Sequence, residues 1–201
     1  KKYWDQLKKH IEDNPEFISP EGYRNEVLGL LKMEPQDLCI SRPKERLTWG
    51  VELPFDKDYV TYVWFDALLN YVSALGYPDD QKFKTYWPVA HHVIAKDILK
   101  PHCIYWPTML LSMGISLPKK VAIHGYWLID DSKMSKSVGK TISALDYAEK
   151  YGVEFLRYYF AAKLTNRVDD LDLNLDDFAQ RVNSDLVGKV INIASRTAGF
   201  I

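Results

Sequence analysis

The chain has 201 residues, of which 47% are hydrophobic and 26% charged, and its formal net charge at pH 7 is −1. These values are typical of an ordinary globular protein with one sizeable core, or one domain and parts of its neighbours. Because the net charge is close to zero, no global attraction draws the chain to nucleic acid, and any RNA contact has to use local patches. We find no signal peptide and no apolar run long enough to span a bilayer, so we expect a cytoplasmic protein without membrane contact.

Cys39 and Cys103 are the only cysteines. They form neither a CxxC zinc motif nor a disulfide framework, so free thiols in a reducing compartment are the expected state. The chain starts at Lys1 rather than at a methionine and stops inside a helical pattern. We therefore expect it to be a piece of a longer protein.

The first elements are helical. Residues 3–13 and 21–33 place apolar side chains at helical spacing, and Pro35 ends the second helix. Residues 38–53 are expected to be extended and irregular.

Strands and helices then alternate: we expect a strand over 58–66, a helix over 67–74, a strand over 89–95, a helix over 98–113 and a strand over 121–124. Pro101 is tolerated near the start of its helix, whereas Pro107 predicts a kink or break. Short connections between alternating elements favour an α/β fold with a parallel sheet. In such sheets ligands bind beyond the carboxyl ends of the strands.

The last third of the chain is helical. Gly152 separates candidate helices over 143–151 and 153–163. The acidic segment 169–174 is expected to be a connector, and Asp176 to cap a helix that runs to the end.

Aromatic side chains cluster near the predicted strand ends. Ile98, His102 and Trp106 lie four residues apart and share one helix face, and a second face carries Trp64, Ala67 and Tyr71. If both faces line one cleft, they form an aromatic pocket with a single imidazole. Such a pocket suits an apolar, unbranched side chain, including one with a thioether sulfur. Taken alone, the same residues fit a hydrophobic core, which is the simpler interpretation.

Polar residues near the same ends are candidates for nucleotide contacts. Glu52 and Asp97 are natural acceptors for ribose hydroxyls, and His124 follows a strand. Each by itself is more often a surface or structural residue. The sequence shows no Ser/His/Asp arrangement and no phosphate-cradling glycine-rich loop. A reaction that needs positioning and charge stabilisation rather than a protein nucleophile is compatible with that absence.

A basic loop over residues 130–140 carries Lys133 and Lys136, three residues apart among small hydroxyl residues. A lysine ammonium is a compact charge on a flexible stem, suited to contacting phosphate. An ordinary solvated loop is the alternative. Asn192 and Arg196 lie on one face of the last expected helix, where an amide and a guanidinium could contact the bases of single-stranded RNA. An exposed polar stripe without a ligand is the simpler interpretation.

The string Lys133-Met134-Ser135-Lys136-Ser137 resembles the signature of class I aminoacyl-tRNA synthetases. Residues 62–67, 96–107 and 124–126 are similar to the methionyl-tRNA synthetase family in particular, as are 183–186 and 192–196. The resemblance covers nearly the whole chain.

The resemblance implies roles for individual residues. The catalytic residues would be Lys133 and Lys136. Methionine would be bound by Trp64, Ala67, Tyr71, Ile98, His102 and Trp106. ATP would be bound by Arg42, Glu52, Asp97, His124, Trp127 and the two lysines, and the tRNA anticodon by Asn192 and Arg196. The substrates implied are methionine, ATP with Mg²⁺, and tRNA(Met).

The resemblance also implies a fold and a division of the chain. The fold is α/β: the second half of a class I synthetase Rossmann fold with its parallel sheet, followed by an α-helical region. Residues 1–45 would end a connective insertion, 46–128 form the second Rossmann half, 129–172 the lysine-loop and stem-contact region, and 173–201 begin the helical anticodon-binding domain.

Several family features are not in this chain. The His-Ile-Gly-His-type motif, the first Rossmann half and the zinc-knuckle cysteines are missing, so a structural zinc would belong to the missing part of the connective insertion and this chain alone is expected to be inactive. Ala95, Ser132, Lys140 and Leu68 depart from residues usual in the family, but none removes a charge that the mechanism needs.

Three alternatives stay open at this stage. The chain could belong to an isoleucyl, valyl, leucyl or cysteinyl enzyme of the same class, or to a non-catalytic paralogue that binds tRNA. The third is an unrelated α/β domain with a coincidental lysine loop, which four ordered motif matches disfavour.

Overall fold

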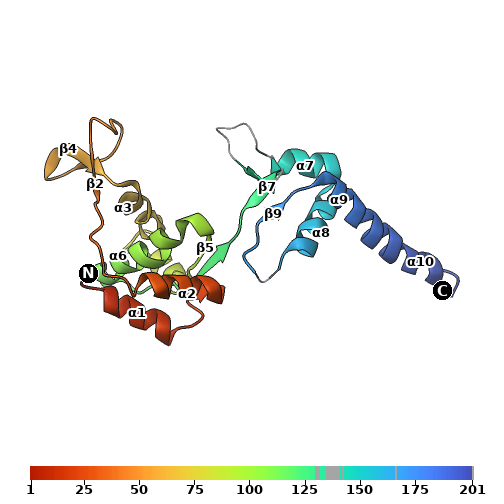
Figure 1. Ribbon diagram of the computed structural model, residues 1–201, viewed down its shortest axis with the longest axis horizontal. Helices are drawn as coiled ribbons and strands as arrows, with labels where there is room; N and C mark the ends of the chain where they lie inside the picture. Colours follow the sequence, from red (N-terminus) through yellow and green to blue (C-terminus); the bar gives the residue numbers. More distant parts are fainter. Residues whose placement is uncertain (130–131, 135–140, 142, 166, 201) are drawn as a thin grey trace. The chain divides into compact units, whose positions relative to one another are not determined.

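The computed structural model describes residues 1–129, 132–134, 141, 143–165 and 167–200. The chain divides into two compact units, Lys1–His124 and Gly125–Ile201 (Figure 1).

The strands of the described residues form three small sheets, and their bounds are β1 (Ile18–Ser19), β2 (Ser41–Pro43), β3 (Glu52–Leu53), β4 (Asp56–Thr61), β5 (His91–Ala95), β6 (Lys120–His124), β7 (Trp127–Ile129), β8 (Ser132–Lys133) and β9 (Leu171–Asp172). The α-helices are α1 (Trp4–Asp13), α2 (Glu21–Leu30), α3 (Val63–Ala67), α4 (Asn70–Ser73), α5 (Gln81–Tyr86), α6 (Trp106–Met113), α7 (Ala144–Tyr151), α8 (Val153–Lys163), α9 (Leu175–Arg181) and α10 (Asn192–Thr197). Short 3₁₀ segments are η1 (Trp87–Val89) and η2 (Lys96–Ile98), and π-helical segments are η3 (Pro101–Tyr105) and η4 (Val182–Ile191).

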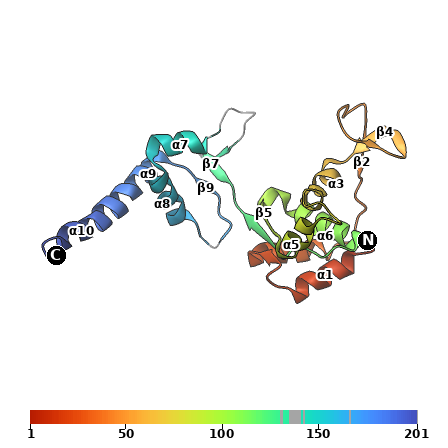
Figure 2. The same ribbon diagram turned by 180° about the vertical axis from the view of Figure 1, so that it is seen from behind.

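A parallel sheet organises the N-terminal unit. Its order is β1-β6-β5, and both strand pairs are parallel. Helix α1 packs against α2 and α6 (Figure 2). The register places Ala95 opposite His124, so the carboxyl ends of β5 and β6 meet at one edge. This sheet and its helices confirm the α/β fold class.

The third strand of that sheet was not the one expected. The strand expected over 58–66 is wrong in extent and in partners: β4 ends at Thr61 and lies antiparallel between β2 and β3 in a separate sheet. Its composition favours a strand but does not choose the strand's partners, and segments nearby in sequence supply them. The two-residue β1, too short for a periodic signal, occupies the third place.

The residues after β4 are helical for a packing reason. Val63–Ala67 forms α3, where an extended strand end was expected. Trp64 and Leu68 thereby pack into a core with Trp106 and Leu110. The expected helix over 67–74 is correspondingly split between α3 and α4.

The helix expected over 98–113 is not continuous. It is a π-helical segment over Pro101–Tyr105 followed by α6 from Trp106. The change from π-helix to α-helix therefore comes one residue before Pro107, which is the second residue of α6. Pro101 lies at the start of the π segment, as expected.

The C-terminal unit combines a sheet of order β8-β7-β9 with helices α7 to α10. The helices expected over 143–151 and 153–163 are confirmed, with Gly152 between them at φ +86°. The acidic connector contains a strand, because Leu171 and Asp172 pair in parallel with β7. The cap of α9 is Asn174 rather than Asp176: its side chain accepts from the N–H groups of Asp176 and Asp177.

Each unit has its own apolar core. In the N-terminal unit one buried cluster consists of Leu68, Val72, Trp87, Trp106, Leu110 and Ile115. In the C-terminal unit a buried cluster consists of Leu156, Tyr159, Leu173 and Phe178.

Leu110→Ala should lower the free energy of unfolding of the N-terminal unit by about 2–5 kcal/mol, because its fully buried side chain leaves a cavity. Met113→Ala, on the exposed end of the same helix, should cost much less. Urea unfolding followed by tryptophan fluorescence measures both, since five of the six tryptophans lie in this unit. Equal losses for the two variants would contradict the assignment of the core.

Candidate active site

An aromatic and imidazole cluster lies where α3, α4, η3 and α6 meet β5. The Trp64 and Tyr71 rings contact the His102 ring at centroid distances of 5.6 and 5.8 Å. Tyr71 also lies 5.9 Å from Trp106. His102 and Trp106 are buried, whereas Tyr71 is 37% exposed, so the cluster has a buried floor and an open aromatic side. The structure therefore brings together four of the six residues expected to bind methionine.

The remaining two of the six lie close in sequence to that cluster. Ile98 ends η2, and its carbonyl oxygen lies 3.0 Å from Nδ1 of His102. Ala67 is exposed at the end of α3.

The hydrogen bonds of His102 determine which nitrogen carries the proton. A carbonyl oxygen only accepts, so Nδ1 donates to Ile98. In the neutral ring Nε2 then accepts, and the Tyr71 hydroxyl donates to it over 2.9 Å. Burial lowers the pKa of His102, although its hydrogen bond to the Ile98 carbonyl opposes the shift. The cluster thus presents a neutral imidazole.

His92 completes the cluster, although it is not among the site residues expected from the sequence. Its Nε2 accepts a hydrogen bond of 3.1 Å from the Trp106 indole, and its ring lies 4.3 Å from that of Tyr71. Burial lowers the pKa of His92 to about 4, and the nearby His102 adds to the shift. The signal was available in the alternation of β5, where His92 and Ile94 face inward and their neighbours outward.

The strand ends hold two of the expected nucleotide contacts. Asp97 lies in η2, immediately after β5, and His124 ends β6 opposite Ala95. The expectation that polar residues gather at this edge of the sheet is confirmed for these two residues.

Arg42 and Glu52 lie in the antiparallel sheet, both opposite Val60. Arg42 stacks over the Tyr62 ring at 4.3 Å and donates to the carbonyls of Cys39 and Ser41. Glu52 is ion-paired with Lys44 and with Lys57, at 3.5 Å from the latter. The hydrogen bond from Lys44 lowers the pKa of Glu52, which therefore remains an ionised acceptor.

In the C-terminal unit, Lys133 lies on β8 with its ammonium 3.9 Å from the centroid of the Tyr126 ring. Lys136 lies outside the described residues. Gly125 permits a close approach, and the group that approaches is the chain itself: a Cβ there would lie 2.3 Å from the Asp169 carbonyl oxygen.

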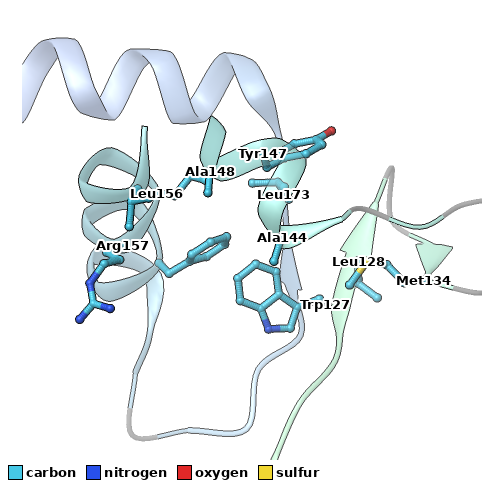
Figure 3. Close-up of a pocket in the computed structure, with 11 residues that line it drawn as sticks. Trp127, Leu128, Met134, Ala144, Tyr147, Ala148, Leu156, Arg157 and Leu173 are labelled. Carbon is cyan, nitrogen blue, oxygen red and sulfur yellow. The ribbon is translucent and has the colours of Figure 1, made fainter. Parts of the chain in front are cut away.

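Trp127 and Met134 line an apolar cavity of about 450 Å³ in this unit (Figure 3). Trp127 packs edge-on to Phe160, with centroids 3.8 Å apart. Leu156 and Leu173 of the core are among the other residues that line it. Asn192 and Arg196 are exposed on α10, four residues apart and so on one face.

Across the residues that the structure describes, no group of three or more His, Cys, Asp or Glu side chains converges as a metal site. None of the helices in that part of the chain is long and apolar enough to cross a bilayer.

The parallel sheet with polar residues at the carboxyl ends of its strands makes this an α/β protein of the kind in which ligands bind at that edge, and a helical unit with a lysine-bearing strand follows it in the chain. The family model for class I tRNA synthetases (M) matches residues 1–198. The chain therefore belongs to that family.

Individual relatives agree. The methionine–tRNA ligase of Caldanaerobacter subterraneus is 41% identical over 201 residues, covering 99% of this chain and 31% of the relative. That of Clostridium tetani is 44% identical over 203 residues, covering 100% of this chain and 31% of the relative. The solved Mycobacterium tuberculosis methionyl-tRNA synthetase in complex with methionyl-adenylate has a TM-score of 0.83 at 40% identity, covering 97% of this chain and 38% of that one. The chain thus spans about a third of the length of these relatives.

The buried His92 should make stability depend on pH. Its ring stays neutral in the folded chain down to about pH 4 but protonates near 6.5 when unfolded. The unfolded state therefore binds more protons between these values, and the free energy of unfolding should fall as the pH drops from 6.5 to 4.

His92→Gln keeps an acceptor for Trp106 and removes the titration, so it should flatten this part of the profile, as measured by urea unfolding at several pH values. His91→Gln, at the exposed neighbouring position, is the control and should retain the slope of the unmodified chain.

Proposed function

We propose that the protein containing this chain is a methionine–tRNA ligase, which activates methionine with ATP to methionyl-adenylate and transfers the methionyl group to tRNA(Met). The observation that carries the proposal is the cluster of Trp64, Tyr71, His92, His102 and Trp106 in a chain of the class I family.

The cluster suits methionine because its polar atoms bond to one another. The Tyr71 hydroxyl donates to His102, and the Trp106 indole donates to His92. The surface that the cluster presents to a ligand is therefore mostly that of its rings. Such a surface favours a flexible apolar side chain and makes good contacts with a thioether sulfur. Ala67 and Ile98 would line the same pocket.

ATP would lie at the strand ends, with Asp97 and His124 on the nucleoside and Arg42, Glu52 and the backbone near Trp127 as further contacts. Arg42 and Glu52 already have partners, so a nucleotide would have to share or displace those contacts.

Lys133 and Lys136 would act on the phosphates. The methionine carboxylate attacks the α-phosphorus and pyrophosphate leaves, so the step needs charge neutralisation rather than a protein nucleophile. Mg²⁺ would accompany ATP as part of the substrate. The contact of Lys133 with the Tyr126 ring is of a kind that contributes only about 0.5–1 kcal/mol when it is exposed.

The proposal also assigns the regions of the chain. Residues 46–128 would be the second Rossmann half, 129–172 the lysine-loop region, and 173–201 the start of the anticodon-binding helices, with 1–45 ending the connective insertion. Asn192 and Arg196 would contact the anticodon.

Amino-acid-dependent exchange of pyrophosphate into ATP tests the assignment on the protein that contains this chain. We expect exchange with methionine. Exchange driven by isoleucine, valine, leucine or cysteine would replace methionine with another substrate of the same class. A protein that binds tRNA but supports no exchange would be a non-catalytic paralogue.

Lys136→Ala should reduce methionine-dependent exchange by about 10²-fold or more, because one stabilising cation is removed from the transition state. Methionine binding, measured by calorimetry, should survive. Lys150→Ala, an exposed lysine on α7, is the control and should be active. Loss of binding together with exchange would contradict a phosphate role.

Tyr71→Phe should raise the KM for methionine by about 10-fold, because Nε2 of the buried His102 loses its donor. Tyr77→Phe, a partly exposed tyrosine of the same unit, should leave the KM unchanged. A similar KM for the two variants would place methionine elsewhere.

A further inference from the structure

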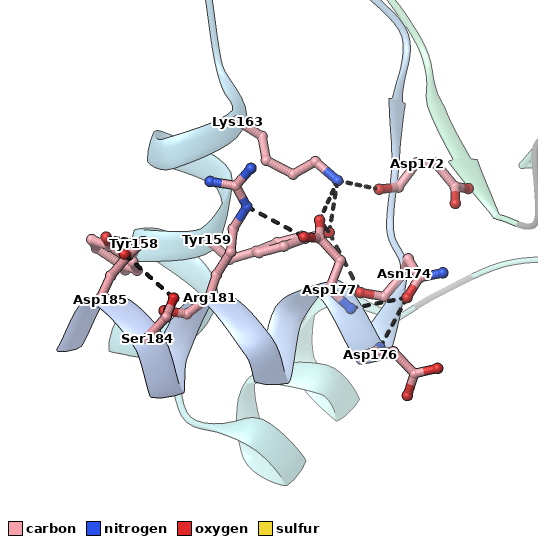
Figure 4. Close-up of polar contacts among 10 residues, drawn as sticks. All are labelled: Tyr158, Tyr159, Lys163, Asp172, Asn174, Asp176, Asp177, Arg181, Ser184 and Asp185. Carbon is pink, nitrogen blue, oxygen red and sulfur yellow. Dashed lines mark hydrogen bonds and ion pairs between the residues drawn. The ribbon is translucent and has the colours of Figure 1, made fainter. Parts of the chain in front are cut away.

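Elements α9, η4 and α10 follow one another without a break and form the final helical stretch of the chain. Helix α8 contacts this stretch at two separate points (Figure 4). The neighbouring residues Tyr158 and Tyr159 each donate a hydroxyl hydrogen bond to an aspartate of that stretch. Tyr159 donates to Oδ2 of Asp177 over 2.9 Å, and Tyr158 donates to Oδ2 of Asp185 over 3.0 Å. The two aspartates lie eight residues apart, on α9 and η4.

The contact at Asp177 continues back to the strands. Lys163 donates to Oδ2 of Asp177 over 2.7 Å, to the Tyr159 hydroxyl over 2.9 Å and to the Asp172 carbonyl oxygen over 3.2 Å. Asp172 belongs to β9, which pairs with β7, and β7 pairs with the strand that carries Lys133. A continuous set of hydrogen bonds therefore joins that strand to α9.

Both aspartates are held as ionised acceptors. The hydrogen bond from Lys163 lowers the pKa of Asp177, and the hydrogen bonds from Lys189 and Tyr158 lower the pKa of Asp185. Lys189 also forms an ion pair with Asp185 at 2.6 Å. Hydrogen bonds to an ionised group are stronger than those between neutral groups.

Two contacts constrain a helix in a way that one does not. Eight residues of helix span about 12 Å, so two contacts at that separation fix the direction of the axis as well as its position. Arg196 lies eleven residues beyond Asp185, or about 16 Å further along. At that distance a tilt of about 10° about Asp185 would move a side chain by roughly 3 Å, as much as a hydrogen bond is long.

We propose that Asp177 and Asp185, each held by a tyrosine of α8, are positioning residues that set the direction of the helix carrying Asn192 and Arg196. The inference rests on the proposed function, in which that helix reads the anticodon. Both residues are then needed for charging intact tRNA and are dispensable for forming the adenylate.

The test uses the protein that contains this chain and compares three reactions: methionine-dependent pyrophosphate exchange, charging of intact tRNA(Met), and charging of a minihelix that has the acceptor stem but no anticodon. The variants are Asp177→Asn and Tyr158→Phe. The matched controls are Asp176→Asn and Tyr151→Phe. The Asp176 carboxylate and the Tyr151 hydroxyl form no hydrogen bond within the part of the chain that the structure describes.

Asp177→Asn and Tyr158→Phe should lower kcat/KM for intact tRNA by about 10-fold relative to their controls, chiefly through KM. The rates of pyrophosphate exchange and of minihelix charging should stay within about 2-fold of those of the unmodified protein. This is a smaller change than the loss of one hydrogen bond at a site used by the reaction would produce. The double variant Tyr158→Phe/Asp185→Asn should lose little more than Asp185→Asn alone, because that single change already weakens the contact that Tyr158→Phe removes.

Equal losses in exchange and charging would indicate a general structural role and overturn the inference. Equal losses for intact tRNA and minihelix, or no difference from the controls, would overturn it as well. An unmodified protein without methionine-dependent exchange would instead contradict the proposed function. In that case tRNA affinity, measured by fluorescence anisotropy, decides the inference: weaker binding by Asp177→Asn than by Asp176→Asn supports it, and equal binding overturns it.

Discussion

The parallel pairing of β5 with β6 is the constraint on which the candidate site depends. It places Ala95 opposite His124, so η2 begins at the same edge of the sheet at which β6 ends. The inward face of β5 carries His92, which accepts the indole hydrogen of Trp106. Strand β5 therefore contributes His92 to the aromatic cluster, and its carboxyl end leads into η2, which carries Asp97.

The π-helical segment η3 lies between β5 and α6 and contributes one residue of the cluster. It contains His102, whose Nδ1 donates to the Ile98 carbonyl while Nε2 accepts from Tyr71. Burial keeps both imidazoles of the cluster neutral, since it lowers both pKa values. A cluster whose polar atoms bond mainly to one another discriminates by shape and ring contact, as an apolar side chain requires. The C-terminal unit uses ionised groups instead, because its aspartates lie close to lysines at a partly exposed helix surface.

The sequence misled where a pattern depended on partners distant in the chain. Residues 58–66 have the composition of a strand, yet the strand ends at Thr61. Trp64 lies in the helix that follows, and its side chain packs against the core. Two-residue strands such as β1 and β9 show no period, because pairing with β6 and β7 creates them. The cap of α9 falls on Asn174, two residues before the expected Asp176, because several adjacent residues there are competent caps.

Local residues determined much of this protein by themselves. Helical spacing located α1, α2, α7 and α8, Gly152 marked the boundary between the last two, and the motif around Lys133 indicated the family that the comparison then showed. The spacing of Ile98, His102 and Trp106 indicated a shared face. Only the tertiary structure decided that Tyr71 donates to His102, that Trp106 donates to His92, and that α8 holds the last helical stretch through Asp177 and Asp185. Such contacts join residues up to 31 positions apart in sequence, so they depend on how strands pair and helices pack rather than on any local period.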